Sequence, residues 1–195
     1  MARALRSTLV VALAALAFTG VAQASGGNYV VDGGTAAEQG QVRSALNASS
    51  FNWSLVPTQV AIHIGRGIYT SYSTPGQIWL DANLLDAGTF SWGVVQMEYA
   101  HQVHFSLLND QMRADLTTAL GAKAWCWEVP GLTHADNGCE RFSATLAWAY
   151  WPSKSNSMQP QSPSDESAAM APAKFRALLA QLLGERSLAA VRAPR

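Results

Sequence analysis

The stretch "WGVVQMEYAHQVHF", residues 92–105, decides how this chain is interpreted. It lies in a run, residues 94–108, that is apolar and periodic enough to predict a buried helix. Side chains four positions apart stack on one face of a helix. Met97 and His101 are therefore expected to share a face, with Glu98 beside them.

This arrangement is the metal-binding motif H-E-x-x-H with its first residue changed. In the motif, two histidines bind one Zn²⁺, and the glutamate between them acts as general base on a metal-bound water. A third protein ligand comes from elsewhere in the chain, and water holds the fourth position. Here Glu98 stands at the base position and His101 at the second-ligand position, while Met97 replaces the first ligand.

Two further segments complete a family resemblance. "GCERFSATLAWAYW", residues 138–151, predicts a helix that opens with Glu140, and "AIHIG…TPGQIWLD", residues 61–81, predicts short strands. With the motif helix, these segments resemble the zincin superfamily. The resemblance is closest to its glutamate-type members, the gluzincins, and to small secreted bacterial zincin-like proteins.

The resemblance implies a zincin-like α+β fold, in which a strand beside the motif helix holds an extended peptide or protein substrate. It implies His101 and Glu140 as metal ligands, Glu98 as catalytic base, and zinc as the metal. It also implies that the helix bearing Glu140 packs closely against the motif helix. Small residues that fit this packing follow on the same face: Ser143, Ala144 and Ala147.

Met97 is the departure from the family pattern. A thioether is a soft ligand that suits Cu(I) better than Zn²⁺, so zinc binding is expected to be weakened or lost. Two hypotheses remain open, a metal-dependent peptidase with a weak or rearranged site and an inactive pseudo-peptidase that binds a peptide or a cell-envelope partner. A third is a secreted structural domain whose motif is accidental.

Other residues could substitute for the missing ligand. His104 lies three positions after His101 and can share its face, so a site of His101, His104 and Glu140 is conceivable. His134 lies on a predicted loop and could swing in or contact substrate. A stripe of Met97, His101 and His104 would suit copper.

Purely structural interpretations exist for the same residues. Met97 can be core packing, and Glu98 with His101 can be a buried hydrogen-bonded pair. Glu140 can complement a helix N-terminus. Asp165-Glu166, residues 165–166, is expected to be a solvated acidic pair.

The N-terminus predicts export. Arg3 and Arg6 precede the apolar run "LVVALAALAF", and Ala22-Gln23-Ala24 forms an A-x-A cleavage site, as in a secretory signal peptide cleaved after Ala24. We expect a secreted or cell-envelope protein. Its two cysteines, Cys126 and Cys139, then predict a disulfide, with a catalytic thiol of Cys126 paired to His134 as the rival.

The chain of 195 residues carries 13 basic and 13 acidic residues, which offers no basic surface for nucleic acid and none for stable membrane association. The element order of helix, strands and further helices indicates segregated α+β structure. The Ser- and Pro-rich stretch is expected to be a loop or linker. The predicted parts are a signal peptide (1–24), a zincin-like domain (25–152), the Ser/Pro-rich loop (153–171) and a C-terminal helix and tail (172–195).

Overall fold

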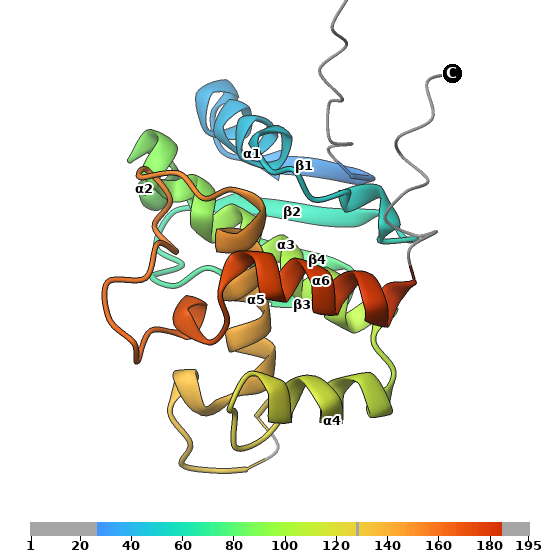
Figure 1. Cartoon of the computed structure of the whole chain (residues 1–195). Helices are drawn as coiled ribbons and strands as arrows, with labels where there is room; N and C mark the ends of the chain where they lie inside the picture. The colour runs from blue at the N-terminus through green and yellow to red at the C-terminus, as the bar shows by residue number, and fades with distance from the viewer. Residues whose placement is uncertain (1–26, 128, 185–195) are drawn as a thin grey trace, which may run out of the picture.

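The computed structural model describes residues 27–127 and 129–184 (Figure 1). The predicted signal peptide, residues 1–24, lies outside the described residues. The described chain is a mixed α+β structure with one four-stranded sheet and six α-helices. The strands are β1 (Tyr29–Gly33), β2 (Val60–Gly65), β3 (Tyr72–Thr74) and β4 (Gln77–Asp81). The helices are α1 (Ala36–Ala48), α2 (Ala82–Leu85), α3 (Trp92–Leu107), α4 (Asp110–Ala119), α5 (Gly138–Tyr150) and α6 (Pro172–Leu183).

The sheet has the strand order β1-β2-β4-β3. β1, β2 and β4 run parallel to one another, and β3 pairs antiparallel with β4 at the edge. β2 alternates as predicted, because Val60, Ile62 and Ile64 are buried whereas Ala61 and His63 on the opposite face are partly exposed. One face of the sheet therefore packs into the core.

Side-chain caps set two helix boundaries. Thr35 Oγ1 accepts from the backbone N of Glu38, and Glu38 Oε2 accepts from the backbone N of Thr35, so a capping box begins α1. Asn109 Oδ1 accepts a hydrogen bond of 2.9 Å from the backbone N of Met112 at the start of α4. This cap separates α4 from α3.

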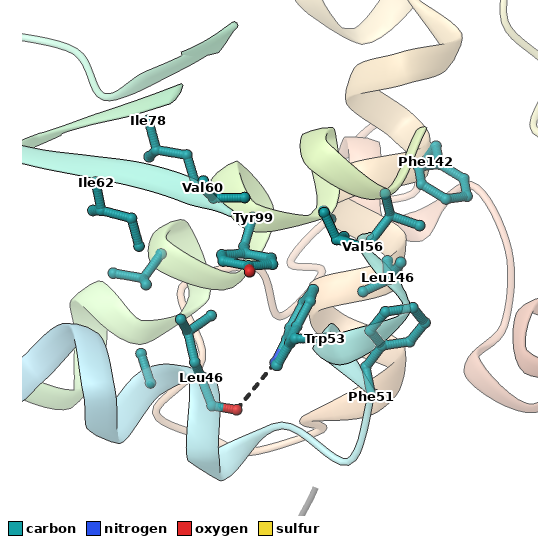
Figure 2. Packing of buried hydrophobic residues seen from close by; sticks show 14 of the residues in the cluster. Leu46, Phe51, Trp53, Val56, Val60, Ile62, Ile78, Tyr99, Phe142 and Leu146 are labelled. Atoms are coloured by element: carbon teal, nitrogen blue, oxygen red, sulfur yellow. Dashed lines mark hydrogen bonds between the residues drawn. The ribbon is translucent and has the colours of Figure 1, made fainter. Parts of the chain in front are cut away.

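The core lies between the sheet and the helices, with Trp53 in a central position (Figure 2). Its ring contacts Phe51 and Tyr99 edge-on, with centroids 4.9 and 5.2 Å away. Its Nε1 donates a 3.0 Å hydrogen bond to the backbone O of Leu46, so the one polar atom of this buried ring has a partner. Tyr99 belongs to α3, which ties the motif helix to this core.

Two glutamines fix the rotation of α3. Gln96 Nε2 donates to the backbone O of Ala45 on α1, at 2.7 Å. Gln102 Nε2 donates to the backbone O of Thr74 at the end of β3, at 2.9 Å. Because α3 is buried along most of its length and held on both sides, the directions of Glu98 and His101 are determined by the fold.

α5 and α6 extend the same core. Ala144 and Ala147 on α5 are buried against Met97, which is the close packing expected from small residues. Phe175 on α6 is fully buried, and its ring lies 5.6 Å from that of Phe142 on α5. The C-terminal helix is thus an integral part of the described structure.

Two stretches differ from their sequence-based interpretation. β1 was not predicted, because its residues lie in a Gly-rich segment and it pairs with the distant strand β2. The Ser/Pro-rich stretch, residues 153–171, is a loop but not a free linker, because Asn156 within it is buried and its Nδ2 donates to the backbone O of Ala147, at 3.1 Å. This loop packs on α5.

Among the described residues, no helix combines the length and the apolar character that crossing a bilayer requires.

Candidate metal and catalytic site

A cavity of about 690 Å³ opens where β3, α3, α5 and the loop between α4 and α5 meet. Its lining includes Glu98, His101 and Glu140, the three residues that the family resemblance singled out. His104 and His134 also line it. The fold therefore brings the candidate residues to one opening.

Glu98 is buried on α3 and reaches across to the edge strand. Ser73 Oγ on β3 lies 2.7 Å from Glu98 Oε2 and donates to it. Burial raises the pKa of the Glu98 carboxyl, and the neighbouring His101 and the Ser73 hydroxyl oppose that shift only in part. A raised pKa makes this carboxylate a stronger base than an exposed glutamate.

His101 and Glu140 meet between the two helices, as the family resemblance implied. His101 Nε2 lies 3.2 Å from Glu140 Oε2, and both side chains are almost fully buried. A histidine and a carboxylate on two packed helices make a rigid pair of potential metal ligands.

His104 lies behind His101 and orients it. His101 Nδ1 and His104 Nε2 are 2.9 Å apart, so Nε2 of His104 is engaged in a hydrogen bond with His101. Burial, together with His101 and Arg113, lowers the pKa of His104 to about 2, so this imidazole is neutral. Its other nitrogen, Nδ1, is buried with no hydrogen-bond partner among the described residues. His104 is placed as a support for His101 more than as a substitute ligand.

His134 arrives from the loop before α5. It lies in the short 3-10 turn His134–Asp136, and its Nε2 is 3.2 Å from Glu140 Oε2. The same carboxylate oxygen therefore lies within 3.2 Å of two imidazoles, those of His101 and His134. The sequence raised His134 as a residue that could swing in, and the structure places it against Glu140.

Glu166 holds the other side of His134. Its Oε1 forms a very short contact with His134 Nδ1, and this hydrogen bond raises the pKa of His134 more than burial lowers it. The Glu166 side chain is 21% exposed, so the expectation of a solvated acidic pair at residues 165–166 is wrong for this residue. No sequence pattern connects Glu166 with a histidine 32 residues earlier.

Met97 does not line this cavity and packs against α5. It is 8% exposed and forms a small cluster with Ala144, Ala147 and Met158. It also lines a neighbouring hollow of about 550 Å³, together with His134 and Glu166 among others. The first-ligand position of the motif and the imidazole of His134 thus border the same space.

The cysteines form the predicted disulfide, Cys126–Cys139. The catalytic-thiol alternative is therefore wrong for the structure as it stands. Cys139 directly precedes Glu140, and the backbone N of Cys139 donates to the backbone O of Trp125, at 2.7 Å. The disulfide joins the loop that carries His134 to the first turn of α5.

Removing this disulfide should cost the fold about 3 kcal/mol in the chain-entropy description of a loop of this length. We expect the Cys126→Ser/Cys139→Ser double variant to unfold at a correspondingly lower urea concentration, with a somewhat steeper slope, because the unfolded chain without the cross-link is less compact. Urea titration followed by tryptophan fluorescence measures both quantities. A variant as stable as the parent would mean that hydrogen bonds alone hold the loop.

The donor types suit a zinc ion. With the cysteines oxidised, the donors near Glu140 are two imidazoles and carboxylates, and two histidines with one glutamate are a known catalytic zinc set. Tetrahedral Zn²⁺ bonds of about 2.0–2.2 Å place neighbouring ligand atoms about 3.3 Å apart, and Glu140 Oε2 lies 3.2 Å from one nitrogen of each ring. Among the described residues, the group that contains His134 and Glu140 and whose donor atoms all lie within 4.8 Å of one another includes Glu166 and not His101, so the rings of His101 and His134 would have to approach each other to share one ion.

Comparisons with protein-family models, curated proteins and solved structures gave no match.

Proposed function

We propose that this protein is an exported, zincin-like, metal-dependent peptidase with a rearranged ligand set. The ligands are His101, His134 and Glu140, and Glu98 is the general base. One observation carries the proposal: Glu140 Oε2 lies 3.2 Å from Nε2 of both histidines, at a cavity that Glu98 also lines. In this set, His134 supplies the imidazole that Met97 does not. The signal sequence and the disulfide support export.

The substrate would lie along β3. This strand is at the sheet edge, and residues 70–73 line the cavity. An extended peptide can add to such an edge through backbone hydrogen bonds. Ser73 on the same strand contacts Glu98, so a peptide bound there would have a carbonyl close to the base.

Each polar residue then has a separate role. A bound zinc ion would polarise the substrate carbonyl and lower the pKa of water. Glu98 accepts the proton from the attacking water and delivers it to the leaving amine, which its burial and raised pKa favour. Ser73 fixes the Glu98 carboxylate, and Glu166 fixes the ring of His134.

A second candidate function is peptide binding without cleavage. It is favoured by the fact that Glu140 pairs with two imidazoles, which already give its carboxylate hydrogen-bond partners. It is favoured also by His104. If His101 Nε2 bound a metal, the proton of that ring would lie on Nδ1 and would donate to Nε2 of His104. The proton of His104 would then lie on its own Nδ1, a buried atom with no partner among the described residues, and an unsatisfied buried donor costs free energy.

Zinc titration of the mature protein separates the two functions. We expect one zinc ion per chain, and a loss of about 100-fold in affinity for His134→Ala, because a ligand contributes about 3 kcal/mol of the roughly 10–16 kcal/mol of a four-ligand site. His63→Ala is the matched control, since His63 also pairs with a carboxylate, Asp32, but lies on the sheet away from the cavity. Calorimetry and elemental analysis measure affinity and stoichiometry.

Two outcomes would contradict the proposal. Absence of zinc uptake, with no cleavage of a denatured protein substrate, would leave the non-cleaving function. Zinc uptake that is unchanged in His134→Ala would remove His134 from the ligand set.

A further inference from the structure

One arginine lines the cavity, and the metal site does not use it. Arg113 on α4 is the only lysine or arginine among the described residues that line the opening. Its side chain is 31% exposed, so its charge is accessible from the cavity. Phe105 and Trp125, which also line the cavity, supply apolar walls.

The guanidinium of Arg113 has few partners for its five donors. Nη2 donates to the backbone O of His104 at 3.3 Å, and Nε is buried with no partner among the described residues. Among the described residues, the carboxylate that pairs with Arg113 is that of Asp110, whose oxygen lies 3.6 Å from Nη1 and whose side chain is fully exposed. An exposed ion pair of this kind contributes little stability, so a ligand anion can displace Asp110 from Arg113.

The cavity lining holds both acidic and basic groups. Its two carboxylates are Glu98 and Glu140, beside which a ligand carboxylate would be repelled. Arg113 is next to His104, six residues further along α3 than Glu98. At a rise of about 1.5 Å per residue, positions 98 and 104 lie about 9 Å apart along the axis of α3, a length that about three residues of an extended peptide cover at roughly 3.3 Å each.

We propose that Arg113 binds the C-terminal carboxylate of a peptide substrate, so that the enzyme removes pieces of two or three residues from C-termini. The cleavage part rests on the proposed peptidase function. Hydrolysis adds one water across the peptide bond, leaving a new carboxylate on the retained peptide and a free amine on the released piece. Arginine suits this role, because its planar donors match the two oxygens of a carboxylate.

Binding is measured by calorimetry with the zinc-loaded mature protein carrying Glu98→Gln, so that the probe stays intact. The probes are acetyl-Ala-Ala-Phe-Ala-Ala with a free C-terminal carboxylate, the same peptide as a C-terminal amide, and an amide in which the last alanine is aspartate. We expect the free acid to bind at least about tenfold more tightly than the first amide, as for a charged hydrogen bond. The aspartate amide should gain little. An equal gain in affinity for the aspartate amide would show that Arg113 binds any carboxylate, and it would overturn the recognition of the C-terminus.

Adding Arg113→Gln should remove the preference for the free acid and leave the affinity for the amide unchanged. Arg176→Gln is the matched control, because Arg176 also donates to a helix carbonyl, that of Ala149, but does not line the cavity. A preference that survives in Arg113→Gln would overturn the proposal, as would equal binding of acid and amide by the parent. If Arg113→Gln does not fold, Arg113→Met serves instead, since it also removes the charge and the donors, and an undiminished preference in it would count as the same refutation.

A separate measurement keeps the two proposals apart. The same peptides are incubated with the zinc-loaded protein that retains Glu98, and mass spectrometry detects any released pieces. An acid preference without cleavage would leave Arg113 as a peptide anchor and refute the peptidase function. Cleavage without a preference for the free acid would support the peptidase function and refute the role of Arg113 in binding the C-terminal carboxylate.

Discussion

Met97→His should raise the affinity of the protein for zinc by about 100-fold or more. The substitution restores an imidazole four residues before His101, on the same face of α3. The site would then offer four protein donors, and one added ligand contributes about 3 kcal/mol. Competition against a zinc-binding dye measures the change.

The hollow beside Met97 makes a sharper form of this test possible. Met97 and His134 border the same space, so a histidine at position 97 should be able to replace His134 as a ligand. We therefore expect Met97→His to restore most of the zinc affinity that His134→Ala loses. Met112→His, on α4 and outside both cavities, is the control. Failure to gain affinity in either background would refute the zincin-like arrangement of α3 and α5.

Glu98→Gln should reduce peptide hydrolysis by a factor of about 10² to 10⁴, the usual contribution of a general base. The amide keeps the shape of the side chain and can still accept from Ser73. Because Glu98 is not in the ligand set, zinc affinity should change little. Parallel measurements of hydrolysis and zinc binding check both expectations, and a variant that still cleaves would exclude Glu98 as the base.

The same substitution should stabilise the metal-free protein at neutral pH. Burial raises the pKa of Glu98 above its ordinary value of 4.5, so the folded state favours the protonated form. Below that ordinary value the parent keeps its full stability, and it loses stability as the pH rises through the raised pKa. Thermal unfolding in a chelator should show a higher Tm for Glu98→Gln at pH 8 and a vanishing difference near pH 4.

The part of the site carried by helices could be predicted from the sequence. Helical periodicity fixes where Glu98 and His101 point relative to each other, and the small residues of α5 indicate how closely Glu140 can approach. The structure agrees with that expectation to within ligand distance. The sheet strands β2 and β4 were also predicted, because their alternation is a local property of the chain.

The part of the site carried by loops could not be predicted in the same way. His134 lies next to Glu140 because the disulfide and the backbone around residues 124–139 set the course of a loop that has no periodic pattern. Glu166 meets His134 only because the Ser/Pro-rich loop packs on α5. Arg113 enters the cavity through the angle between α3 and α4, which depends on tertiary packing.

The disulfide between Cys126 and Cys139 also determines when the site can form. While the cysteines are reduced, as in a cytosol, α3 and α5 can still bring His101 and Glu140 together, but the loop with His134 lacks its covalent anchor. On the proposed ligand set, the newly made chain would hold two ligands and gain the third only after oxidation outside the cell membrane. Export would then act as the activating step and protect the producing cell from its own hydrolase.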